Sequence, residues 1–216
     1  MTLHVLKPRL RAGLRPIARR GAALGISANQ VTVVSAVVST ALGIGVAVNA
    51  VSRALFLLIP LWLVLRLALN ALDGLLAAEH GQRSPLGAYL NELSDVLSDA
   101  ALYAPFAFVA PFSVLSVGVV IFLSTVCEFA GALGPMVGGE RRYDGPMGKS
   151  DRAIVFGGLG VWIGMTEALP SLAAWLMPAL GVLLVATVIN RVSAGLRATR
   201  VLATHASREH EQTVQE

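Results

Sequence analysis

Long apolar runs, separated by short polar segments, make up most of this chain. Six such runs cover residues 29–50, 54–78, 86–110, 112–136, 153–166 and 171–189. A helix needs about 20 mostly apolar residues to cross the hydrocarbon core of a bilayer, and most of the runs meet that length. The pattern therefore predicts an all-α integral membrane protein with six transmembrane helices.

The first 26 residues follow a different pattern, in which apolar and basic positions each recur at helical spacing. The apolar positions are Leu3, Leu6, Leu10, Leu14 and Ile17, and the basic positions are Lys7, Arg11, Arg15 and Arg19. This favours an amphipathic helix in the membrane interface over residues 1–26, with a disordered basic tail as the alternative. Residues 27–200 would then form the six-helix transmembrane domain, and 201–216 a polar C-terminal tail.

Composition agrees with a membrane location. The 216 residues are 55% hydrophobic and 14% charged, whereas soluble domains average about 45–50% apolar and about 25% charged residues. The formal net charge is +4, which in a soluble protein would suggest nucleic acid. Here the basic residues flank the apolar runs, so membrane lipids are the expected partners and no nucleic acid is expected.

The same basic residues predict the orientation. With six spans, both termini, Arg83 and the basic loop at 141–152 fall on one side, and only Arg53 falls in a loop on the other. Because positive charge accumulates in cytoplasmic loops, that side is predicted to be cytoplasmic, in a cell or inner membrane.

One stretch, residues 70–99, is unusually polar. It consists of two apolar-rich segments around a polar turn at 79–85, which predicts a helical hairpin. Two faces of that hairpin carry small or oxygen-bearing side chains at helical spacing: Asn70, Asp73 and Ala77 on the first helix, and Gly87, Asn91, Asp95 and Asp99 on the second. Carboxylate and amide oxygens are preferred ligands of Mg²⁺ and Mn²⁺, and such groups are costly at membrane depth unless they pair or bind an ion.

This stretch resembles the signature of the CDP-alcohol phosphatidyltransferases, D-x-x-D-G-x-x-A-R-x8-G-x-x-x-D-x-x-x-D. The matching positions are Asn70, Asp73, Gly74, Ala77, Ala78, Gly87, Asn91 and Asp95, and the spacing is complete. Asn70 and Asn91 stand where the family has aspartates, and Ala78 stands where it has arginine. We interpret these departures as a divergent active branch, with reduced activity as the alternative.

The resemblance implies transfer of a phosphatidyl group from a CDP-linked lipid to an alcohol, with release of CMP. It further implies that Mg²⁺ or Mn²⁺ is held by Asn70, Asp73, Asn91 and Asp95, with Asp95 as the general base. The CDP-lipid would contact Asn70, Asp73 and the small residues Gly74, Ala77 and Gly87. A homodimer is also compatible with the family.

The loop at 137–152 carries Lys149 and Arg152 at the mouth of the fifth run. Family members have basic residues here for the acceptor, which implies that Lys149 and Arg152 bind a phosphate on a phosphorylated polyol. The alternative is a loop that only sets topology.

Two ionisable residues lie deeper in the apolar runs, and their roles stay open at this stage. Arg66 suits either a pair with a carboxylate such as Asp99 or a direct phosphate contact, and Glu128 suits either function or a hydrogen bond to a neighbouring helix. Such residues leave one competing function, a small transporter or channel. The clustering of polar residues near one membrane face speaks against a continuous pathway.

Overall fold

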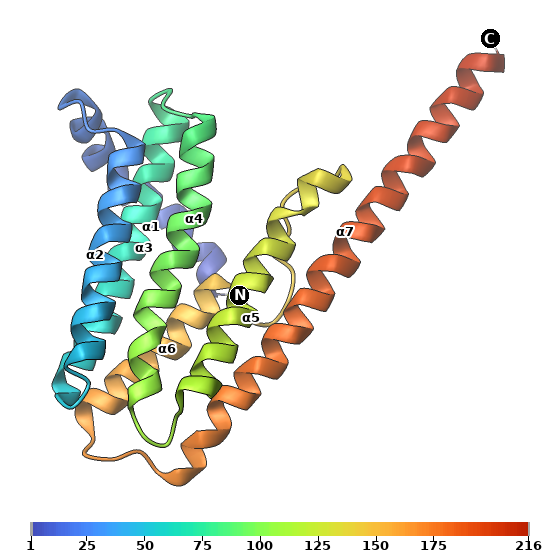
Figure 1. The fold of residues 1–216 in the computed structure, drawn as a ribbon. Helices are drawn as coiled ribbons and strands as arrows, with labels where there is room; N and C mark the ends of the chain where they lie inside the picture. Colours follow the sequence, from blue (N-terminus) through green and yellow to red (C-terminus); the bar gives the residue numbers. More distant parts are fainter. Residues whose placement is uncertain (1, 216) are drawn as a thin grey trace.

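The computed structural model describes the backbone of residues 2–215 and the side-chain surroundings of residues 10–199. Within that range seven α-helices and short 3-10 turns are joined by loops, and the described backbone contains no strand (Figure 1). The α-helices are α1 (Thr2–Ala23), α2 (Ala28–Val48), α3 (Leu58–Glu79), α4 (Pro85–Tyr103), α5 (Val114–Ala132), α6 (Lys149–Met165) and α7 (Leu176–Gln215). The all-α prediction is confirmed.

Four of these segments are long and apolar enough to cross a membrane: Ala28–Val48, Arg53–Glu79, Val114–Val137 and Ser171–Thr199. Helices α4 and α6 fall outside that group. Asn91, Glu92, Asp95 and Asp99 make α4 too polar, and α6 has only 17 residues. The structure thus supports four of the six predicted spans, and the count of six stays a prediction.

The arrangement of the turns agrees with antiparallel crossing of the bundle. The connections after α2, α4 and α6 gather at one end, whereas the α3–α4 turn and the start of α2 lie at the other (Figure 1). The apolar core fills the end away from the α3–α4 turn. There Tyr103 stacks on Phe156 with ring centroids 3.8 Å apart, and Phe106 packs edge-on against Phe56 and Phe156.

Helices α2 and α4 pack closely because small residues line their interface. A Cβ atom on Gly43 of α2 would overlap the main-chain carbonyl of Ala101 in α4. Ser27 and Gln30 form a capping box at the start of α2. Gln82, in the α3–α4 turn, accepts a hydrogen bond from the Ala28 amide at 2.7 Å, which ties the hairpin turn to that helix start.

The amphipathic segment forms helix α1, whose inner face packs on α3. Ala18 is buried with Ala28, Leu75 and Leu76, and Leu14 lies against this cluster. Leu3, Leu6 and Lys7 of the predicted stripes lie outside the described side chains, as do the side chains of the 201–216 tail. The backbone of α7 continues to Gln215.

Candidate active site

The hairpin predicted from the sequence is formed by α3 and α4, and its two polar faces meet. The Asn70 amide nitrogen donates to the Asp95 Oδ1 atom at 3.3 Å. Ser84 caps α4 by accepting from the Gly87 amide at 3.0 Å, and Pro85 occupies the first turn, so the second helix begins at the predicted place. The spacing of the motif therefore brings its first and last positions together.

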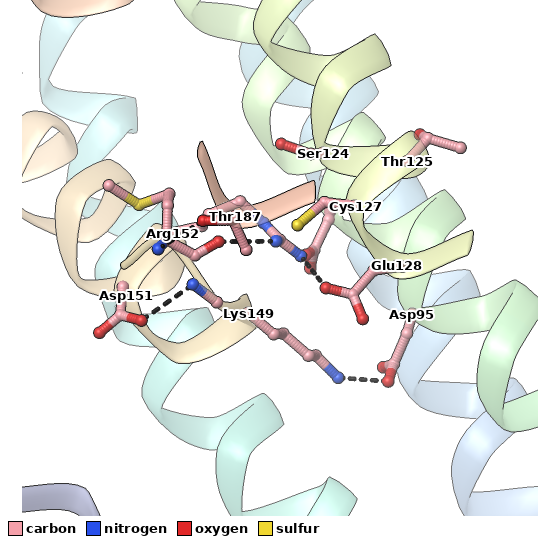
Figure 2. Close-up of polar contacts among 12 residues, drawn as sticks. Asp95, Ser124, Thr125, Cys127, Glu128, Lys149, Asp151, Arg152 and Thr187 are labelled. Carbon is pink, nitrogen blue, oxygen red and sulfur yellow. Dashed lines mark hydrogen bonds and ion pairs between the residues drawn. The ribbon is translucent and has the colours of Figure 1, made fainter. Parts of the chain in front are cut away.

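The Asp95 carboxylate forms ion pairs with two cationic side chains. Its Oδ1 atom lies 3.1 Å from the Arg66 guanidinium, and its Oδ2 atom forms an ion pair with the Lys149 ammonium group. Figure 2 shows Lys149 reaching from α6 to Asp95 on α4. The predicted general base thus sits between a buried arginine and a partly exposed lysine.

A chain of buried ion pairs continues behind Asp95. Arg66 also pairs with Asp99, whose Oδ1 atom lies 2.5 Å away, and the other Asp99 oxygen lies 3.2 Å from Arg152. Arg152 in turn pairs with Glu128 at 2.9 Å (Figure 2). A buried carboxylate or guanidinium is costly without a partner, so these pairs account for the polar residues that lie deepest in the bundle.

These ion pairs partly answer the question of what Arg66 and Glu128 do within the bundle. Arg66 forms the ion pair with Asp99 that was one of its two interpretations. Glu128 is a buried carboxylate shared by cations from other segments: Arg141 at 3.1 Å and Arg191 at 3.6 Å join Arg152 around it.

The two basic residues predicted to bind the acceptor occupy different surroundings. Helix α6 begins at Lys149 because the Asp151 carboxylate accepts from the Gly148 amide at 2.9 Å. Lys149 keeps 32% of its side chain exposed, whereas Arg152 keeps 2% and directs its guanidinium towards Asp99 and Glu128. Only Lys149 is placed where a soluble acceptor could reach it directly.

Asp73 contacts α2. Its Oδ2 atom accepts a hydrogen bond from the Thr32 hydroxyl at 2.7 Å, and both residues are buried. This contact could not be predicted from the sequence, because Thr32 is one of several small polar residues in an apolar helix.

The small motif residues lie against other helices. A Cβ atom on Gly87 would lie 2.8 Å from the Asn29 side-chain oxygen, and one on Gly74 would lie 3.7 Å from the Arg11 guanidinium. Ala77 packs against the cluster that α1 and α3 share. Gly87 thus allows the close approach of Asn29 from α2, whereas the distance at Gly74 is an ordinary van der Waals contact.

A cavity of about 780 Å³ opens beside these groups, between α1, α3, α4 and α6. Its polar and charged lining consists of Arg11, Arg15, Arg66, Asn70, Asn91, Asp95, Asp99, Tyr143, Lys149 and Ser150. Four of these side chains are cationic and two are carboxylates, which gives the cavity an excess of positive charge. Such a lining suits an anionic ligand.

The carboxylate and amide oxygens of the motif are ligands that a hard divalent cation prefers, but their number is limited. Among the residues described, no group of three or more His, Cys, Asp or Glu side chains converges as a metal site. Asn70 and Asn91 add neutral amide oxygens in the cavity, but both oxygens of Asp95 already face cations. The donor set therefore fits one divalent cation better than two.

Comparison with known proteins identifies one relative by sequence and several solved structures with the same fold. The Escherichia coli inner membrane protein YnbA is 40% identical over 198 residues, which are 88% of this chain and 94% of YnbA. No family model matches the chain.

Solved structures of the phosphatidylinositol phosphate synthase PgsA1 from Mycobacterium tuberculosis have the same architecture. The structure with CDP-DAG bound superposes with a TM-score of 0.65 at 23% identity, over 85% of this chain and 92% of that one. The structure in complex with manganese and citrate gives 0.64 at 21% identity, over 85% and 87%. The chain belongs to the same family as YnbA, and it shares the fold of the phosphatidylinositol phosphate synthase PgsA1.

Proposed function

We propose that this protein transfers a phosphatidyl group from a CDP-linked lipid to an alcohol and releases CMP. The observation that carries the proposal is the contact between Asn70 and Asp95 in a charged cavity, produced by the complete motif spacing. The shared fold with PgsA1, one structure of which holds CDP-DAG, supports a CDP-linked lipid as donor.

The reaction is a displacement at phosphorus. The acceptor hydroxyl oxygen forms a bond to the phosphorus of the phosphatidyl group, and the bond from that phosphorus to the CMP oxygen breaks. The hydroxyl proton passes to the Asp95 carboxylate, which acts as general base. CMP leaves with the electron pair of the broken bond.

Lys149 is our candidate for the acceptor phosphate. Its ammonium group lies on a flexible stem in the cavity and pairs with Asp95. An acceptor phosphate would draw Lys149 away from Asp95 and leave that carboxylate open to the incoming hydroxyl. The sequence predicted that Arg152 would bind the same phosphate. We propose instead that Arg152 holds the carboxylates of Asp99 and Glu128 in place.

Mg²⁺ or Mn²⁺ is the proposed cofactor, with oxygens of Asn70, Asp73, Asn91 and Asp95 as its donors. When bound, the ion would neutralise charge on the donor pyrophosphate. A PgsA1 structure contains manganese, which supports a divalent ion in this fold. Arg66 and Lys149 supply positive charge at Asp95 themselves, so we propose one ion in this site.

The relative YnbA is named an inner membrane protein, and four segments of this chain are apolar enough to span a bilayer. We place the protein in the inner membrane with the cavity facing the cytoplasm, where CDP-linked lipids and phosphorylated alcohols would both have access.

The decisive experiment measures CMP release by the purified protein from CDP-diacylglycerol with Mg²⁺ or Mn²⁺, across a panel of phosphorylated and neutral alcohols. We expect release with a phosphorylated polyol and none after Asp95→Asn. Ion flux in liposomes without CMP release under any of these conditions would support the transporter function instead.

A further inference from the structure

The family motif places an arginine at residue 78, near the end of α3, and this chain has Ala78 there. Residue 78 lies one helical turn beyond Gly74 on the same face of α3. Ala78 is exposed and carries no guanidinium, so this chain lacks the positive charge that the motif supplies at this position.

Helix α1 brings two other arginines to this face. Ala18 packs on Leu75 and Leu76, which fixes α1 across the last turns of α3. The Arg11 guanidinium lies 3.7 Å from where a Cβ on Gly74 would be, and Arg15 pairs with Glu79 at 3.1 Å. The two guanidinium groups thus contact α3 at positions before and after residue 78 in the sequence.

Arg11 and Arg15 also line the cavity that contains Asn70, Asp95 and Lys149. The Arg15 guanidinium already forms an ion pair with Glu79. Among side chains 10–199, none forms a hydrogen bond or ion pair with Arg11, so its charge is available to a ligand. Planar guanidinium groups bind phosphate oxygens in a two-pronged geometry that an ammonium group does not reproduce.

We propose that Arg11 binds a phosphate of the donor pyrophosphate and so replaces the guanidinium that the family motif carries at residue 78. The identity of the ligand, a CDP-linked lipid, rests on the proposed function. An amphipathic helix in the interface holds its basic side chains at the depth of lipid phosphates, which suits this role. Helix α1 is then part of the donor site as well as a membrane anchor.

The competing hypothesis is that Arg11 binds only the anionic headgroups of surrounding lipids. Arg19 provides the matched control, because it is an exposed arginine two turns further along α1 that does not line the cavity. Assays in vesicles of zwitterionic phosphatidylcholine remove the anionic bulk lipid and leave the donor as the anionic lipid.

The experiment compares wild type, Arg11→Ala, Arg19→Ala and the double variant Arg11→Ala/Ala78→Arg, all as the full chain in such vesicles. Two quantities are measured: the KM for CDP-diacylglycerol from CMP release, and the affinity for CDP by direct binding. For Arg11→Ala we expect the donor KM to rise about tenfold and the CDP affinity to fall in proportion, with the acceptor KM unchanged. Arg19→Ala should match wild type, and Ala78→Arg should recover most of the loss.

A donor KM and CDP affinity within twofold of wild type in Arg11→Ala would overturn the assignment. So would an equal loss in Arg19→Ala, which would indicate general surface charge, or no recovery in the double variant. A wild-type chain that binds CDP but releases no CMP with any alcohol would refute the proposed function, and the CDP affinity of Arg11→Ala would still decide this inference. If the wild-type protein does not bind CDP, both the proposed function and the role of Arg11 are refuted.

Discussion

Lys149 and Arg152 stand three residues apart at the start of α6, yet the structure gives them opposite surroundings. The Lys149 ammonium group reaches a cavity, whereas the Arg152 guanidinium lies among carboxylates in the bundle. Similar residue types in one turn of helix can therefore have different surroundings, and their burial differs accordingly.

The first prediction compares alanine substitutions at these two positions. Lys149→Ala should raise the KM for a phosphorylated acceptor at least tenfold, since it removes the charge that would bind the phosphate. The donor KM and the thermal stability should stay near wild type. Arg152→Ala should instead destabilise the protein by about 3–5 kcal/mol, because it leaves Asp99 and Glu128 with fewer partners in a buried network.

Steady-state kinetics and thermal unfolding in detergent measure the two effects separately. A silent Lys149→Ala, or efficient turnover of an unphosphorylated alcohol, would remove the acceptor assignment. An Arg152→Ala variant with wild-type stability and a raised acceptor KM would return Arg152 to the acceptor site.

The second prediction concerns Asp95, the proposed base. Asp95→Asn keeps the size of the side chain and its contact with Asn70 but cannot accept the proton at neutral pH. General base catalysis contributes roughly 10²–10⁴-fold, so CMP release in a single turnover should fall by at least a hundredfold while the protein remains folded. Asp144→Asn, an exposed carboxylate outside the cavity, is the control. Wild-type turnover in Asp95→Asn would refute the base assignment.

The third prediction tests the metal donors. Asp73→Asn should raise the Mg²⁺ or Mn²⁺ concentration needed for half-maximal activity, because it removes one of two motif carboxylates. Titration of CMP release with each ion measures the shift, and binding of Mn²⁺ followed by electron paramagnetic resonance gives a readout apart from activity. We expect one bound Mn²⁺ per chain in the wild type. Two bound ions, or an unchanged metal requirement in Asp73→Asn, would contradict the proposed donor set.

At the scale of elements, the contact between α2 and α4 holds one side of the hairpin. Gly43 stands where a Cβ atom would overlap the Ala101 carbonyl, whereas Gly45, two residues further along α2, has open space around it. The two glycines share one helix and differ only in the face they occupy.

This gives the fourth prediction. Gly43→Ala should destabilise the protein by about 1–3 kcal/mol, since α2 and α4 must move apart to admit a methyl group. Gly45→Ala should be neutral or slightly stabilising, because alanine favours the helix over glycine. Thermal unfolding of both variants in the same detergent measures the difference. Equal stabilities would show that α2 and α4 pack less closely than the structure has them.

At the scale of the whole molecule, the sequence predicted those features that depend on periodicity along one helix. The hairpin and the facing of Asn70 and Asp95 both follow from spacing, and both are present. The pairing of Arg66 with Asp99 could be foreseen because a buried guanidinium needs a carboxylate.

The features that the sequence did not reveal are contacts between helices far apart along the chain. Nothing local distinguishes Thr32 as the partner of Asp73, or Arg11 from its neighbours on α1. The burial of Arg152 likewise depends on where Glu128 of α5 lies. The helical pattern also suggested that the fifth run starts at residue 153, whereas the cap by Asp151 starts α6 at Lys149.

The last prediction concerns the orientation of the whole bundle. The cavity is lined by Tyr143 and Lys149 at the basic loop before α6, and the positive-inside rule predicts that this end faces the cytoplasm. Cys127 is buried, so it should contribute little background to labelling. In intact cells, an impermeant thiol reagent should label Arg53→Cys or the fully exposed Val51→Cys, and should miss Asp144→Cys until the cells are opened. Labelling of position 144 from outside would invert the bundle and place the cavity on the external face, away from cytoplasmic CDP-linked donors and phosphorylated acceptors.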